Sequence, residues 1–144
     1  MQEQARQQAQ DQFEHWLRQE RRAVYTDVLQ DADDLRSKFD ALVDCRSEIG
    51  DGSTAVEALL EFDTAFQLLG RRVVSLTTVA HPEVAKMYQR VMAECQTVLS
   101  IVRGNFPPDS LLVHKTYLYL AIGELVAAVS VDTQVGPAER RGMR

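Results

Sequence analysis

Apolar residues recur along most of this chain at alternating spacings of four and three, the period of one face of an α-helix. In residues 54–79 the apolar row consists of Ala55, Leu59, Phe62, Phe66, Leu69, Val73 and Leu76. In residues 83–103 it consists of Val84, Tyr88, Val91, Cys95, Val98 and Val102. Together with residues 3–48 and 110–131, the pattern predicts four helices and no strand. Such rows are typical of helices that cross at about 20°, so we expect an all-α, antiparallel four-helix bundle with an overlong N-terminal helix.

Three breaks with turn chemistry separate the predicted helices. Gly50 and Gly52 precede Thr54 and Glu57, which have the spacing of a capping box and place the start of the second helix at Thr54. The second break is the tripeptide HPE at 81–83, with a proline suited to the first helical position, and the third is GNFPPD at 104–109. We therefore expect one domain over residues 1–131, followed by a mobile basic tail over residues 132–144.

The fourth predicted helix is apolar on nearly every side, so it must be covered on more than one face. Its apolar run, residues 111–131, contains His114, Lys115 and Glu124, which favours a buried helix over a membrane span. A buried Glu124 would need an arginine partner, and the candidates are Arg71, Arg72 and Arg90.

The first predicted helix is too long for the other three. Residues 3–48 contain no proline and no glycine, which allows a single helix of about 69 Å, against roughly 32–39 Å for each of the others. Its N-terminal half carries Phe13, Trp16 and Leu17, and each of these is worth roughly 1.5–3 kcal/mol when removed from water. Either the helix breaks near residues 19–22 and folds back, or this half packs against a second copy. Because no breaker residue is present, we expect a homodimer.

The charge, the N-terminal sequence and the cysteines disfavour several classes of protein. The chain has 16 basic and 21 acidic residues and a formal charge of −5, which argues against a general nucleic-acid binder. The N-terminal residues show no secretory signal, so we expect a cytoplasmic protein. Cys45 and Cys95 lack metal-ligand spacing and are expected to be two reduced thiols.

We find no recognisable set of catalytic residues in the sequence. A di-metal site in a helical bundle uses Glu-x-x-His motifs, and the chain has none. We expect Glu57 to cap a helix, Glu61 to be solvated, and Asp33 and Asp34 to belong to a solvated acidic face. The three histidines lie in separate predicted segments, at His15, His81 and His114. We therefore expect no enzyme, no metal and no cofactor.

The stretch from Phe13 to Tyr25, FEHWLRQERRAVY, followed by LQDA at 29–32, resembles the opening of many short helical proteins of streptomycete-type actinobacteria. The shared features are Trp16, the Arg21-Arg22 pair and Tyr25. The predominance of arginine over lysine, thirteen to three, is consistent with such an origin. The resemblance covers about 25 residues and implies no activity.

The function we expect is that of a small interaction or regulatory module with an unknown protein partner. The predicted partner contacts are Phe13, Trp16, Leu17, Arg21 and Tyr25, with Tyr117 and Tyr119 as secondary contacts. Two alternatives stay open. A bundle that binds a small ligand or effector would need a pocket lined by Phe62, Phe66, Tyr88, His114 and Tyr117. A weak nucleic-acid-binding regulator would use the basic tail with Arg18, Arg21 and Arg22.

Overall fold

The computed structural model describes residues 2–47, 52–104 and 109–134, and every regular element within them is a helix. The helices are α1 (Gln2–Ser47), α2 (Gly52–Gly70), α3 (Val73–Val79), α4 (Pro82–Arg103) and α5 (Asp109–Gln134). The protein is therefore all-α. The first helix is continuous over 46 residues, as the lack of proline and glycine predicts.

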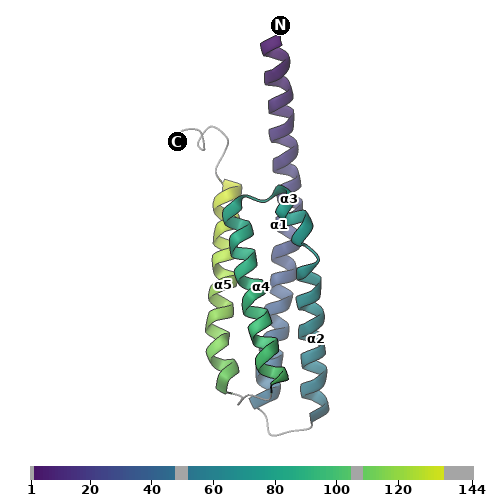
Figure 1. Ribbon diagram of the computed structural model, residues 1–144, viewed down its shortest axis with the longest axis vertical. Coiled ribbons are helices and arrows are strands. Elements are labelled where there is room, and N and C mark those ends of the chain that lie inside the picture. The colour runs from purple at the N-terminus through teal and green to yellow at the C-terminus, as the bar shows by residue number, and fades with distance from the viewer. Residues whose placement is uncertain (1, 48–51, 105–108, 135–144) are drawn as a thin grey trace.

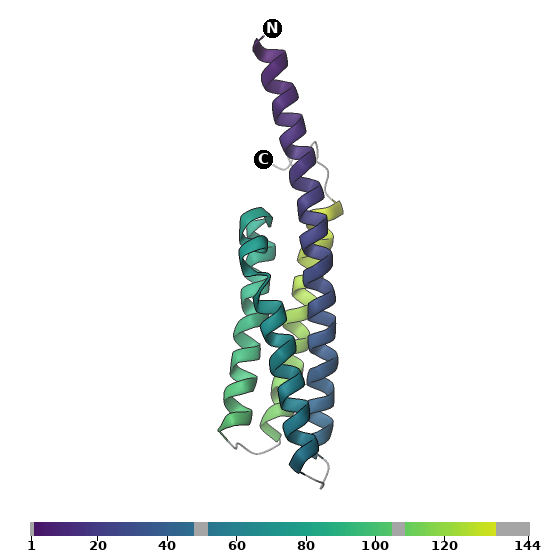
Figure 2. The same cartoon turned by 90° about the vertical axis from the view of Figure 1, so that its right-hand side faces the viewer.

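The four long helices lie side by side along one axis (Figures 1 and 2). Along the chain, α1 descends, α2 and α3 return, α4 descends again and α5 returns, so that the start of α4 and the end of α5 lie at the same end. The most extensive contacts join α4 to α5 and α1 to α2, and α1 also contacts α3 and α5. The first turns of α1 project beyond all the other helices.

The core lies between these helices, and each of them contributes one row of side chains to it. On α1 the row of buried residues is Tyr25, Val28, Ala32, Leu35, Phe39 and Leu42, with spacings of three and four. The row predicted on α4 is confirmed, because all six of its residues are buried. On α5 the buried positions include Leu111, Leu118, Ala121 and Leu125. Burial of these rows is the main stabilising contribution to the fold.

The predicted second helix, residues 54–79, is in fact two helices. A turn at Arg71 and Arg72 separates α2 from α3, and the Arg72 N–H donates to the Leu69 carbonyl at 3.1 Å. Gly70, at the end of α2, has a low helix propensity, and the turn directs the Arg72 side chain to Asp31 at 2.8 Å. The prediction of one helix was wrong because an uninterrupted apolar row hid this break.

The other predicted boundaries differ less from the structure. Pro82 is the first residue of α4, and His81 caps that helix because its Nδ1 accepts a hydrogen bond from the Glu83 N–H at 3.2 Å. Helix α2 begins at Gly52, two residues before the predicted capping box. The predicted tail begins too early, because α5 continues to Gln134 and contains a buried Asp132. Residues 135–144, the rest of that predicted tail, lie outside the described residues.

Helix α5 alone has the length and composition of a membrane-spanning helix, over Ser110–Thr133, among the residues that the structure describes. The core helix of a soluble protein passes the same criterion. In this chain one side of α5 packs against the core, and the opposite side is exposed.

Candidate interaction surfaces

The two parts of α1 have different surroundings. We call residues 2–20 the arm, and the rest of α1 together with α2 to α5 the body; Figure 2 shows the arm extending away from the body. The buried row of α1 begins at Tyr25, and the positions that would continue it toward the N-terminus are Arg21, Arg18 and Glu14. These side chains are charged, so the core of the body ends where the arm begins.

A group of polar contacts, the arm-base network, holds α1 at this point. The Tyr25 hydroxyl donates to Asp132 Oδ2 at 2.7 Å and accepts from the His81 N–H at 3.0 Å. Arg21 Nε donates to the Val79 carbonyl at 2.5 Å, and Arg21 Nη1 lies 3.8 Å from Asp132 Oδ1. The network therefore joins α1 to the α3–α4 turn and to the last turns of α5.

Two predicted partner contacts belong to this network instead. Tyr25 is only 1% exposed, and the Arg21 side chain is 15% exposed, so both side chains are used within the chain. Burial, followed by the hydrogen bond to Asp132, raises the pKa of Tyr25 to about 12. We correct the prediction accordingly: Arg21 and Tyr25 fix the base of the arm and do not form part of an accessible surface.

The arm carries an exposed aromatic pair. Phe13 is 57% exposed and Trp16 is 47% exposed, with ring centroids 5.8 Å apart, and the half-buried Leu17 lies one turn after Phe13. No part of the body described by the structure covers these side chains. Exposed aromatic clusters of this kind are typical of protein interaction sites. The arm thus places three of the predicted partner residues at one accessible location.

A second apolar surface follows the outer side of α5. We call it the α5 face, and its large exposed side chains are Leu112, Val113, Tyr117, Leu120, Val126 and Val131. Tyr117, predicted as a secondary partner contact, is 51% exposed. Gly123 lies on this helix, and no neighbouring atom comes within 4 Å of the place that an alanine Cβ would take, so the helix backbone is accessible there.

Tyr119 does not belong to the α5 face. It is half-buried against the core, and its hydroxyl donates to Asp40 on α1. The Arg36 guanidinium lies 5.9 Å and the Lys115 ammonium 5.5 Å from the centroid of its ring. Burial, followed by the hydrogen bond to Asp40, raises the pKa of Tyr119 to about 12. Tyr119 thus contributes to contact between α1 and α5, and the prediction that it contacts a partner is corrected.

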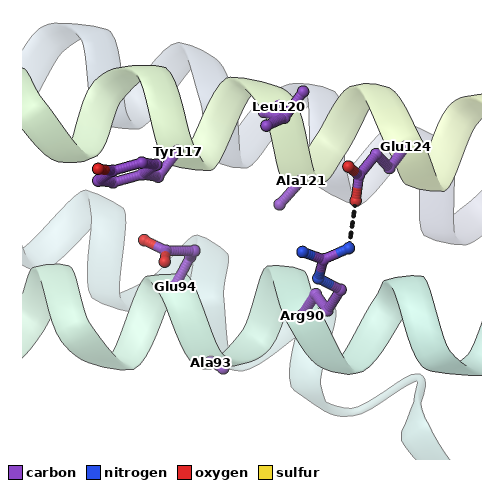
Figure 3. Close-up of a pocket in the computed structure, with 7 residues that line it drawn as sticks. All are labelled: Arg90, Ala93, Glu94, Tyr117, Leu120, Ala121 and Glu124. Atoms are coloured by element: carbon purple, nitrogen blue, oxygen red, sulfur yellow. Dashed lines mark hydrogen bonds and ion pairs between the residues drawn. The ribbon is translucent and has the colours of Figure 1, made fainter.

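A shallow pocket of about 210 Å³ lies between α4 and α5, beside the α5 face (Figure 3). Arg90 Nη1 donates to Glu124 Oε2 at 2.7 Å at one end of this pocket, which confirms Arg90 as the partner of Glu124 among the three predicted arginines. Tyr117 and Glu94 line the other end. Glu94 was not singled out from the sequence, although its position one turn after Arg90 on α4 could have indicated it. In the structure its carboxylate pairs with His114 at 3.3 Å.

The five residues predicted to line a ligand pocket have different surroundings in the described part of the chain. Phe62 packs against Phe39 in the core, with ring centroids 5.8 Å apart, and the buried Tyr88 donates to the Leu69 carbonyl at 2.8 Å. Phe66 is partly buried against the core, and His114 is paired with Glu94. Of the five predicted residues, Tyr117 alone lines the pocket between α4 and α5. Two of the five side chains, Phe62 and Tyr88, are fully buried in the core instead.

The groups that could carry chemistry are dispersed. Within the described part of the chain, no three His, Cys, Asp or Glu side chains are placed to hold a metal ion. Asp33 forms an exposed ion pair with Arg36 at 2.9 Å, and Glu61 lies 3.7 Å from Lys38. Cys45 and Cys95 are both free, and burial raises the pKa of the Cys95 thiol to about 12, which disfavours the reactive thiolate.

No protein-family model matches this chain, and comparisons with curated proteins and with solved structures find no significant match.

Proposed function

We propose that this protein is a non-enzymatic interaction module, an antiparallel four-helix bundle that forms a cytoplasmic homodimer through its arm. The observation that carries the proposal is the exposure of Phe13 and Trp16 on a helix that continues well beyond its own core. Burying such side chains contributes roughly 1.5–3 kcal/mol each. A second copy of the chain carries the same apolar residues and can cover them symmetrically.

The stability of the arm supports the same proposal. Most helical stability in proteins comes from packing of an apolar face, and the arm has no such packing within the described part of the chain. The arm extends about 28 Å beyond the arm-base network at the rise of an α-helix. A coiled-coil contact between two arms would supply the missing packing.

The α5 face is the second surface of the proposed module, and we assign it to a protein partner. Its six large exposed apolar residues lie along one helix, and the ion pair of Arg90 with Glu124 lies at its edge. Aromatic anchors with a charged rim are typical of protein interfaces. In this proposal the arm joins two copies, and the α5 face of each copy remains available.

Light scattering of the full chain tests the proposal. We expect a mass of twice 16.3 kDa for the natural sequence at tens of micromolar. The double substitution Phe13→Ala and Trp16→Ala should give 16.3 kDa with unchanged helical circular dichroism. A matched control removes two exposed apolar side chains of the α5 face, Leu120→Ala with Val131→Ala, and should leave the dimer intact. A natural chain that runs as a monomer under these conditions would overturn the proposal.

A further inference from the structure

Three residues of the arm lie on one line along the helix at a spacing of seven. Arg6 precedes Phe13 by seven positions, and Glu20 follows Phe13 by seven. Seven residues turn an α-helix by about 700°, which is about 20° short of two full turns. Because α1 is one continuous helix, Arg6, Phe13 and Glu20 share one side of it.

The same side also carries small and apolar residues. With spacings of four and three, the row reads Gln2, Arg6, Ala9, Phe13, Leu17, Glu20 and Val24. Arg6 and Glu20 are both exposed, and neither side chain has an ion-pair partner in the described part of the chain. The row thus has one positive and one negative charge, placed symmetrically about an exposed phenylalanine.

We propose that two arms pair in antiparallel orientation, with the two-fold axis passing at Phe13. This inference rests on the proposed homodimer and specifies its geometry. Position i of one arm then faces position 26 − i of the other. Arg6 faces Glu20 of the partner subunit, and Phe13 faces the partner's Phe13. Ala9 faces the partner's Leu17, so that a small side chain leaves space for a large one.

Charge repulsion disfavours the parallel orientation of the two arms. In a parallel, in-register pair, Arg6 would face Arg6 and Glu20 would face Glu20, and like charges at facing positions repel. In the antiparallel pair the same four side chains form two ion pairs, one on each side of the axis. The two orientations bury the same apolar residues, so the charges decide between them.

The test uses charge reversal and the dissociation constant of the dimer, measured by sedimentation at 50 mM salt. Arg6→Glu and Glu20→Arg should each weaken the antiparallel dimer about tenfold, because each substitution replaces two ion pairs by two repulsive pairs. The double variant Arg6→Glu with Glu20→Arg should return to within about threefold of the natural chain. As a control, Arg22→Glu reverses an exposed charge on the opposite side of the helix and should change the constant less than twofold.

The outcomes separate this inference from the proposed function. A natural chain that remains monomeric overturns both. A dimer in which the single reversals have no effect, or in which the double variant is not restored, overturns the antiparallel geometry and leaves the homodimer standing.

Small-angle X-ray scattering of the natural dimer gives an independent readout. The antiparallel dimer should have a maximum dimension of about 100 Å, because both bodies lie at opposite ends of the paired arms. A parallel dimer, with its bodies side by side, should measure about 70 Å, and that value would overturn the proposal.

Discussion

The arm and the body share helix α1, yet they differ in what surrounds the apolar residues of that helix. In the body, Val28, Leu35 and Phe39 of α1 are fully buried by other helices of the same chain. In the arm, Phe13 and Trp16 lie on an equally regular helix and remain about half exposed. The comparison teaches that helix continuity is fixed by local propensity, whereas burial depends on how much chain is available to cover each face. Substitutions in the two regions should therefore have very different effects on folding and on association.

The largest expected effect comes from the core of the body. Phe39→Ala should lower the free energy of unfolding by about 3–5 kcal/mol, because it leaves a cavity beside Phe62. Phe13→Ala, the same substitution in the arm, should lower it by less than about 0.5 kcal/mol in the monomer. Urea unfolding at a protein concentration at which light scattering gives the monomer mass measures both values. Equal effects would mean that the arm is covered by its own chain.

The next effect concerns the boundary between the two regions. Asp132→Ala removes the acceptor of the Tyr25 hydroxyl and the carboxylate beside Arg21, so a buried donor loses its partner. We expect a loss of about 2–4 kcal/mol in the free energy of unfolding. The control Asp33→Ala breaks an exposed ion pair with Arg36 and should cost less than about 0.5 kcal/mol. If the two variants unfold alike, the arm-base network contributes nothing to stability.

Alkaline pH should also act on the body. Tyr25 keeps its proton in the folded state up to a pKa of about 12, whereas an unfolded tyrosine loses it near 10.0. The contribution of Tyr25 to the free energy of unfolding is therefore fully present below pH 10. It is lost as the pH rises from 10 through 12, by roughly 2 kcal/mol for this residue. Unfolding in urea at pH 9, 10 and 11 measures the decline. Tyr25→Phe should reduce its slope, and an unchanged slope would contradict the assignment.

The smallest effect is a gain in stability. Gly123 lies in the interior of α5 with open space where a Cβ would lie, so Gly123→Ala should improve helix propensity without a clash. We expect an increase of about 0.5–1 kcal/mol in the free energy of unfolding of the body. Thermal unfolding followed by circular dichroism measures it. A decrease would show that α5 packs more closely at this position than its exposure indicates.

Much of the fold follows from periodicity. The α4 row was predictable because its six apolar positions alternate by four and three with polar residues between them, and Pro82 marks its start. The continuity of α1 was predictable because no residue in it breaks a helix. The turn at Arg71 and Arg72 was not, since Leu69 and Leu76 are both buried and the row continues across the break.

The candidate surfaces were only partly predictable. Phe13 and Trp16 lie far from the apolar positions that pack together, so their exposure could be inferred from length alone. The burial of Tyr25 and Tyr119 could not, because α1 and α5 are apolar on several sides and the sequence does not fix which side faces the core. Asp132 gave no signal, since its role depends on a residue 107 positions away in the sequence.

The arm-base network also sets the rotation of the arm about its own axis. Arg21 and Tyr25 are held by the Val79 carbonyl, the His81 N–H and Asp132, which belong to three different segments. Rotation of the helix about its axis would break these contacts, so they favour one orientation of Phe13 relative to the α5 face. Two chains joined at their arms would then present a pair of α5 faces at a defined spacing and angle. A partner with two binding sites would contact both α5 faces only if its sites had the same spacing and angle.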